Sequence, residues 1–243
     1  MIYFSFSWDD GAVEDLKLMD LSLKYSIPGI FFIPATNPER GVMINEDIKR
    51  ISVNNFEIGA HTYSHSYLTN VPLQKANEEL FAGKMYIEQL LGKEVPHFCF
   101  PGGKFNSDLV NISKQYFKSA RTADTCSIGH KNSYLIKPTF HFYNRGKKSL
   151  IFNGLKNSFR IFHLSLKNIS CSDYFELIRK IIADLSSSSC TSYIMIWGHS
   201  WEIEKFMLWN KLDNLFQEIS GKYPGNILSY SDFVKSQTKQ NGN

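Results

Sequence analysis

The chain has 243 residues, of which 43% are hydrophobic and 21% are charged, and its formal net charge is +4. This length and composition are enough to bury one large core, and they argue for a single enzyme-sized domain. No apolar run reaches the roughly 18 residues that span a bilayer. The chain also starts directly in a strand-like run, without the basic segment and cleavage site of a signal peptide. We therefore expect a cytoplasmic protein with no transmembrane segment.

The expected domain covers residues 1–236, and the polar residues 237–243 are expected to be a disordered tail. Neither an internal repeat nor a linker divides the chain. A disulfide framework is excluded because the cysteines are widely spaced and form no CxxC pair. They are typical of thiols in a reducing compartment, and they are Cys99, Cys126, Cys171 and Cys190.

Strand-like and helix-like segments alternate along the first half of the chain. Short β-branched and aromatic runs predict the strands, and apolar residues at helical spacing predict the helices. The predicted strands are Ile2 to Ser7, Gly29 to Ile33 and Phe56 to Ala60, and the predicted helices are Val13 to Tyr25, Asn45 to Val53 with Asn45 as its cap, and Leu73 to Leu91, which ends at Gly92.

The second half continues the alternation. Repeated βα units of this kind predict a parallel barrel or a doubly wound sheet. The predicted strands are Phe98 to Phe100, Ser119 to Thr122, Tyr193 to Trp197 and Ile227 to Leu228, and the predicted helices are Ser107 to Tyr116, Asp173 to Leu185 and Phe206 to Ile219.

Two polar motifs follow predicted strands. Asp9 and Asp10 end the first strand, and His61 and His65 come directly after the third. Alone, the first motif is more typical of a turn and the second of surface histidines. Parallel strands, however, place their carboxyl ends at one edge, where α/β folds have their active sites. Two histidines on one helical turn and a carboxylate from another segment would form a hydrolytic metal site.

Two further motifs complete a family pattern. Phe98 to Gly103 contains a strand followed by Pro-Gly-Gly, and Ile194 to His199 is a strand that ends in a histidine. Together with Ser7 to Gly11 and His61 to His65, in this order, they resemble the NodB-homology polysaccharide deacetylases, carbohydrate esterase family 4. The resemblance implies a distorted (β/α)7-type barrel and metal-dependent hydrolysis of N- or O-acyl groups on sugars.

The resemblance also implies a role for each matching residue. Asp9 would be the general base and His199 the general acid. The backbone N–H of Gly102 would stabilise the oxyanion. One divalent ion, zinc first and Co²⁺, Ni²⁺ or Fe²⁺ as alternatives, would be bound by Asp10, His61 and His65.

The chain departs from the family pattern at two points. Cys99 stands where the third motif has an arginine, which would leave Asp9 without its partner. Arg121 on the next predicted strand is a candidate replacement, although a solvent-facing or phosphate-facing arginine fits equally well. The fourth motif's aspartate has no clear counterpart. Glu202 or Asp124 could take its place beside His199, and a purely capping glutamate is the alternative. Cys99 itself is expected to pack rather than to act as a nucleophile.

A basic segment bears on the substrate. Residues 125–172 contain no Asp or Glu, and this excess of positive charge favours an anionic partner such as a sugar nucleotide, a lipid-phosphate-linked glycan or a membrane surface. Within it, Ser149 to Leu166 is either an interfacial element or, as we expect, a barrel helix or helix–strand pair with a core face. Nucleic acid is disfavoured because no binding motif is present. The basic residues are Lys131, Lys137, Arg145, Lys147, Lys148, Lys156, Arg160 and Lys167.

The sequence thus favours a metal-dependent carbohydrate N-deacetylase. Deformylation of an amino sugar, or hydrolysis of a non-sugar amide, is the alternative on the same scaffold. A barrel that only binds glycan is the alternative from another class. The complete set of Asp9, Asp10, His61, His65 and His199 argues against the binding alternative.

Overall fold

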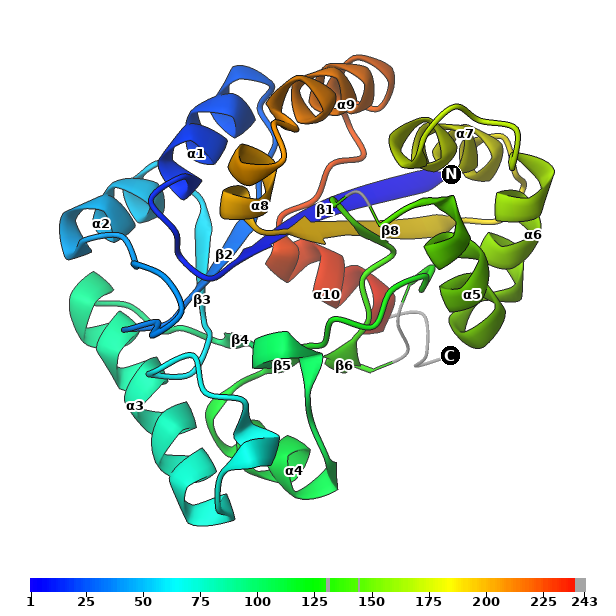
Figure 1. Ribbon diagram of the computed structural model, residues 1–243. Helices are drawn as coiled ribbons and strands as arrows, with labels where there is room; N and C mark the ends of the chain where they lie inside the picture. The colour runs from blue at the N-terminus through cyan, green and yellow to red at the C-terminus, as the bar shows by residue number, and fades with distance from the viewer. Residues whose placement is uncertain (130–131, 144, 239–243) are drawn as a thin grey trace.

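The computed structural model describes residues 1–129, 132–143 and 145–238, and its strands form one parallel sheet (Figure 1). The sheet order is β6-β5-β4-β3-β2-β1-β8-β7, so β6 and β7 are its edges. The sheet curls into a half-barrel, which confirms the predicted distorted barrel. The strands are β1 (Ile2–Asp9), β2 (Ile30–Ile33), β3 (Glu57–Ala60), β4 (His97–Cys99), β5 (Ser119–Arg121), β6 (Tyr134–Ile136), β7 (Phe140–His141) and β8 (Ser192–Gly198).

Helices surround the half-barrel, and one of them, α10, lies on its concave side (Figure 1). Two short 3-10 turns, Leu68–Asn70 and Pro101–Gly103, follow β3 and β4. No helix in the described residues is both long and apolar enough to cross a membrane. The helices are α1 (Asp15–Lys24), α2 (Asn45–Val53), α3 (Leu73–Leu91), α4 (Ser107–Tyr116), α5 (Lys147–Asn157), α6 (Phe159–Lys167), α7 (Tyr174–Ser186), α8 (Ser200–Lys205), α9 (Trp209–Lys222) and α10 (Tyr230–Thr238).

The period-2 alternation of strand side chains divides the core into two parts. In β1, Phe4, Phe6 and Trp8 belong to the large core between the sheet and its outer helices. Phe32 of β2 belongs instead to a smaller core with Tyr230 of α10, and their rings meet edge to face at 5.6 Å. The interior of the half-barrel is therefore filled by α10.

The parallel order brings the polar strand ends together. Asp9 ends β1, Cys99 ends β4 and Arg121 ends β5, while His61 and His199 directly follow β3 and β8. Because the strands run in one direction, these residues share one rim of the half-barrel. The fold thus collects side chains that are far apart in the sequence.

Some sequence predictions were wrong in detail. Asn45 does not cap α2, because its side chain accepts a hydrogen bond from Tyr86 and the cap position is Ile44. The helix predicted from Phe206 to Ile219 begins only at Trp209, since Met207 has a positive φ that separates α8 from α9.

The C-terminal segment also differs from the prediction. Ile227 forms a single bridge with Phe4 rather than a strand. Helix α10 was not predicted, and it continues to Thr238. Residues 239–243, the rest of the predicted tail, lie outside the described residues. The segment from Ser149 to Leu166 forms the helix pair α5 and α6.

Candidate active site

The two histidines of the second motif lie in a loop after β3. The expectation that they share a helical turn is wrong, because Thr62 and His65 both have positive φ values, 62° and 56°. Glu79 of α3 fixes the loop by accepting hydrogen bonds from the backbone N–H groups of Tyr63 and Ser64. The loop therefore depends on a buried carboxylate from a neighbouring helix for its shape.

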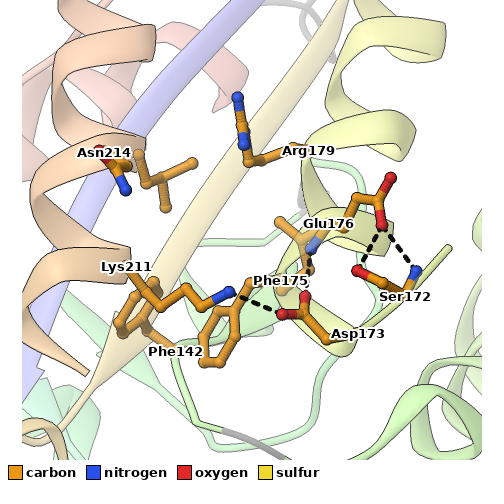
Figure 2. A pocket seen from close by; sticks show the side chains of 10 residues that line it. Phe142, Ser172, Asp173, Phe175, Glu176, Arg179, Lys211 and Asn214 are labelled. Carbon is orange, nitrogen blue, oxygen red and sulfur yellow. Dashed lines mark hydrogen bonds and ion pairs between the residues drawn. The ribbon is translucent and has the colours of Figure 1, made fainter. Parts of the chain in front are cut away.

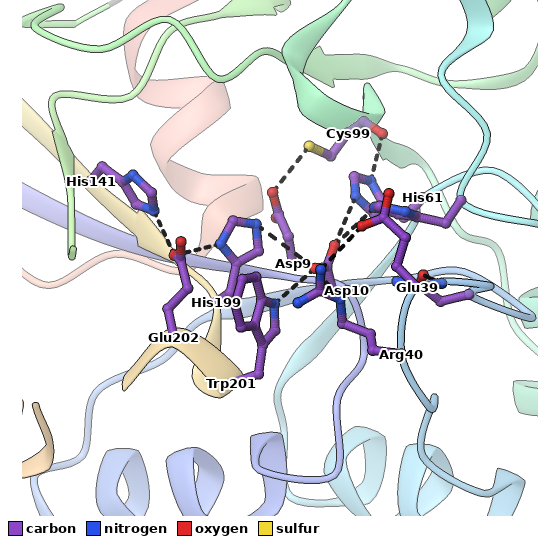
Figure 3. A network of polar contacts seen from close by, with 12 residues as sticks. Asp9, Asp10, Glu39, Arg40, His61, Cys99, His141, His199, Trp201 and Glu202 are labelled. Carbon is purple, nitrogen blue, oxygen red and sulfur yellow. Dashed lines mark hydrogen bonds and ion pairs between the residues drawn. The ribbon is translucent and has the colours of Figure 1, made fainter. Parts of the chain in front are cut away.

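Asp10, His61 and His65 form a buried cluster. Figure 3 shows Asp10 and His61 in this network of polar contacts. Oδ1 of Asp10 lies 3.5 Å from Nε2 of His61 and 3.0 Å from Nε2 of His65. The Nδ1–H group of His61 donates a hydrogen bond to the Cys99 carbonyl at 2.8 Å, which leaves the Nε2 lone pair available to bind a cation. The ligand atoms of the cluster lie within 4.8 Å of one another. Two imidazoles and a carboxylate so arranged fit a divalent cation such as zinc.

The second oxygen of Asp10 has partners of its own. Trp201 donates its indole N–H to Oδ2 at 2.9 Å, and Nε of Arg40 lies 3.6 Å from the same oxygen. The Arg40 guanidinium stacks over the Trp201 ring at 3.7 Å. Burial opposes ionisation of Asp10, but hydrogen bonds from His61 and His65 outweigh it, so its pKa lies well below the usual range. Neither Trp201 nor Arg40 was predicted from the sequence, although Trp201 stands only two residues after His199.

Asp9 lies beside this cluster between two side chains of the rim. The guanidinium of Arg121 forms an ion pair with Oδ1, and the Cys99 thiol donates to Oδ2 at 3.5 Å. Burial opposes ionisation, but Arg121, His61 and His199 outweigh it and hold the pKa of Asp9 below its usual range. Burial raises the pKa of the Cys99 thiol, so the thiol stays neutral and is a poor nucleophile.

Arg121 points into the half-barrel rather than into solvent. Its side chain is fully buried, and its guanidinium lies 4.9 Å from the Trp197 ring and 5.4 Å from the Phe32 ring. The arginine side chain thus reaches Asp9 from β5, where the family pattern would supply it from the Cys99 position in β4.

His199 faces the cluster from the other side. Its Nε2 lies 3.9 Å from Asp10, and its Nδ1 donates to Glu202 at 2.7 Å. Nε2 of His141, at the end of β7, donates to the same Glu202 oxygen at 2.9 Å. Asp124, the other candidate, forms an ion pair with Lys137 instead. His141 was not predicted from the sequence, because no spacing relates it to the other motifs.

The three groups in this chain of hydrogen bonds have shifted pKa values. Burial opposes ionisation of Glu202, but hydrogen bonds from His141 and His199 lower its pKa to about 2. Burial lowers the pKa of His141 to about 4, so His141 is neutral near pH 7. Burial also opposes protonation of His199, but the hydrogen bond to Glu202 and the nearby Asp10 carboxylate raise its pKa. His199 is therefore suited to hold a proton.

Gly102 lies against Tyr67, which lines an open groove. Its φ is +59°, and a Cβ there would stand 2.2 Å from the Tyr67 ring, so the position requires glycine. Tyr67 and His65 line the groove, whose volume is about 500 Å³. The remaining lining comes from the loops after β2 and β3: Thr36, Asn37, Pro38, Glu39, Ser64 and Ser66.

A second cavity of about 310 Å³ lies between α7 and α9, and none of the predicted site residues lines it (Figure 2). Asp173 and Lys211 form an ion pair across it at 2.7 Å. Glu176 of the same wall accepts two hydrogen bonds from Ser172. These charges are already paired, and the cavity shows no group suited to catalysis.

The fold and the matched sequence define the class of protein. The family model described as polysaccharide deacetylase matches residues 2–117, which contain β1 to β4 and the first three motifs. Over residues 2–117 the chain belongs to the polysaccharide deacetylase family, a family of carbohydrate-deacetylating hydrolases.

Individual relatives agree with this assignment. The chain is 27% identical over 111 residues to the peptidoglycan-N-acetylglucosamine deacetylase of Bacillus cereus and 26% identical over 121 residues to the uncharacterised protein YlxY of Bacillus subtilis. These matches cover 45% and 49% of this chain, and 50% and 36% of the relatives, so the chain spans about half of their length or less. The solved structure of the Bc1960 peptidoglycan N-acetylglucosamine deacetylase is similar in fold, with a TM-score of 0.60 and 16% identity over 96% of this chain and 88% of that one.

Proposed function

We propose that this protein removes an N-acyl group, most simply an N-acetyl group, from a sugar in a reaction that requires one divalent cation. The observation that carries the proposal is the buried cluster of Asp10, His61 and His65 with Asp9 and His199 beside it. This cluster combines a proposed cation site, the Asp9 carboxylate, which is not one of the three proposed cation ligands, and His199, which is suited to hold a proton. Those are the parts that amide hydrolysis requires.

Two side chains of the protein, Asp9 and His199, carry out the proton transfers. A divalent cation held by Asp10, His61 and His65, zinc being the first choice, would polarise the acyl carbonyl and acidify water. Asp9 accepts a proton from the attacking water molecule. Arg121 keeps the Asp9 carboxylate ionised, and its ion pair and the hydrogen bond from Cys99 orient that carboxylate. An ionised base in a fixed position is ready to react without reorganisation.

His199 acts on the leaving group. It donates its Nε2 proton to the departing amine, which leaves poorly unless it is protonated. Glu202 accepts a hydrogen bond from the Nδ1–H group of His199 and so fixes the ring orientation and keeps a proton on Nδ1. For Gly102 we propose that its backbone N–H stabilises the oxyanion, in line with the third motif of the family.

The proposed substrate class is an acetylated amino sugar within a larger glycan. The groove beside His65 is open and bordered by the Tyr67 ring, features that suit a sugar chain. The similarity to a peptidoglycan-N-acetylglucosamine deacetylase supports the same class. A sugar nucleotide or lipid-linked glycan as the carrier, and a cytoplasmic location, remain predictions from the sequence.

Acetate release tests the proposal. The purified protein is stripped with a chelator, reloaded with Zn²⁺, Co²⁺ or Ni²⁺, and offered N-acetylglucosamine oligomers, peptidoglycan fragments and acetylated sugar nucleotides. We expect cation-dependent acetate release and loss of one acetyl mass from one of these classes. Formate release from a formylated amino sugar alone would favour the deformylase alternative. Binding of glycan without any acid release, with the cation site loaded, would favour the glycan-binding barrel.

A further inference from the structure

The helix pair α5 and α6 presents an apolar face to solvent. Phe152 is 70% exposed, Phe159 68% and Leu155 60%, and Leu166 and Ile169 are exposed as well. The two helices pack on each other at the outer edge of the molecule (Figure 1). Single exposed apolar residues are ordinary, but a cluster of large ones on one element marks an interaction surface. We refer to these residues as the hairpin face.

The hairpin face is distinct from the side that packs on the protein core. Leu150 of α5 and Ile161 of α6 are buried in the large core and fix the pair to the barrel. A Cβ on Gly154 would stand 2.7 Å from the Phe162 backbone, so glycine allows the two helices to approach closely. Both helices therefore already have a core-facing side, and burial in this chain does not account for the hairpin face.

Basic residues lie beside the hairpin face. Lys148 and Lys156 are exposed, and each stands four residues from Phe152 along α5. Lys167 is exposed at the end of α6, where it pairs with Asp184 of α7. Residues 125–172 contain no Asp or Glu. The face is thus apolar in its middle and positively charged at its borders.

We propose that the hairpin face binds an anionic lipid surface. Phenylalanine and leucine side chains on one side of a helix enter the interface between headgroups and acyl chains, while adjacent lysines pair with headgroup phosphates. A second copy of this chain fits less well, because it would bring two basic borders together. The proposal does not depend on the proposed catalytic activity, since the hairpin face contains none of the proposed catalytic or cation-binding residues.

Vesicle co-sedimentation tests the proposal with the full chain. The protein is mixed with vesicles of phosphatidylcholine alone, or with about 30% phosphatidylglycerol, at low and high salt. We expect binding to the anionic vesicles that weakens with salt, because the lysines contribute through screened charges. Replacing two lysines, Lys148→Glu with Lys156→Glu, should weaken binding by about tenfold or more.

A second pair of variants tests whether vesicle binding depends on the hairpin face or on exposed apolar residues in general. Phe152→Ser with Phe159→Ser should lose most of the vesicle binding. Phe81→Ser on α3, which is also exposed, should bind like the wild type. Thermal unfolding and acetate release, measured in solution, check that each variant is folded.

Three outcomes would overturn the proposal. The first is an absence of binding to anionic vesicles by the wild-type protein. The second is binding that the hairpin variants leave unchanged. The third is a dimer in solution that Phe152→Ser with Phe159→Ser converts to a monomer, because a second copy would then cover the face. Failure of acetate release with intact vesicle binding would count against the proposed function alone.

Discussion

At the scale of single residues, the candidate site pairs each reactive group with a neighbour that sets its charge. Arg121 stabilises the ionised form of Asp9, and Glu202 stabilises the protonated form of His199. A base that stays ionised and an acid that stays protonated have pKa values moved apart by their surroundings. Substitutions at these residues are therefore expected to change pH profiles as well as rates.

Removal of the proposed acid and base should have different consequences. His199→Ala is expected to lose about 10²–10⁴-fold in kcat/KM on an N-acetyl sugar and much less on an aryl acetate, whose phenolate leaves without protonation. Asp9→Asn should lose activity on both substrates, because it removes the acceptor of the water proton. Parallel losses on the two substrates for His199→Ala would assign this histidine another role.

Glu202→Gln should shift the alkaline limb of the kcat/KM profile to lower pH. The Glu202 carboxylate raises the pKa of His199, and an acid is active only while it is protonated. Loss of that carboxylate lowers the pKa of His199, so activity falls at a lower pH than in the wild type. The control is Glu204→Gln, which should leave the profile unchanged. Glu204 lies on the other side of α8, where it pairs with the exposed Lys17. An unshifted alkaline limb in Glu202→Gln would show that Glu202 does not act through His199.

Arg121→Met should move the acid limb to higher pH. Arg121 lowers the pKa of Asp9, and a base is active only above its pKa, so loss of the guanidinium raises the pH at which activity appears. Breaking a buried pair also costs about 3–5 kcal/mol of stability. Arg50→Met, at an exposed arginine near Asp20, is the control. An unchanged acid limb in a folded Arg121→Met protein would contradict the proposed partnership.

At the scale of elements, α3 shapes the loop that carries His61 and His65. A Cβ on Gly83 would lie 2.5 Å from the carbonyl carbon of Thr62, and that backbone has no room to yield without moving the loop. The glycine in the middle of this helix therefore reflects close packing against the loop.

Gly83→Ala is expected to lower stability by about 1–3 kcal/mol and to weaken cation binding, because it displaces both histidines. Gly221→Ala, in α9 with open space around it, should instead be neutral or stabilise by up to about 1 kcal/mol. Thermal unfolding and a cation titration measure the two effects. Equal behaviour of the two variants would mean that α3 does not position the loop.

Helix α10 fills the interior of the half-barrel, and its Tyr230 is fully buried. Tyr230→Ala should cost about 3–5 kcal/mol, since it leaves a cavity under Phe32 and Arg121. Tyr63→Ala, at a 41% exposed tyrosine, should cost much less. The midpoints of urea unfolding check this difference, and similar losses would show that α10 contributes little to the core.

At the scale of the whole molecule, cation binding is expected to be coupled to folding. Asp10, His61 and His65 come from two distant segments and meet only in the folded chain. A cation at about 100 times its Kd should therefore raise the stability of the wild type by about 2.7 kcal/mol. His65→Ala should lose this stabilisation, while His163→Ala, at an exposed histidine of α6, should keep it. Unfolding curves recorded with cation and with chelator measure this gain in stability. Stabilisation retained by His65→Ala would contradict the ligand assignment.

The sequence by itself determined the fold class and the rim residues of β1, β3 and β8. Strong strand patterns ending in Asp9, Asp10, His61 and His199 are local signals, because each lies within a few residues of its strand. The same holds for most helices, whose apolar spacing is local. The shape of the loop between His61 and His65 was not predictable in this way, since Glu79 from another element sets its positive φ angles.

Only the tertiary structure decided which side chains support those residues. Arg121 of β5 reaches Asp9 of β1 although three strands lie between them in the sheet, and His141 of the edge strand β7 meets Glu202, which follows the neighbouring strand β8. Such contacts depend on strand order and on which side of the sheet a side chain faces, neither of which a linear pattern records. The same reason applies to the hairpin face. Apolar residues occur at helical spacing on two sides of α5 and α6, and only the packing shows which side is buried in the core.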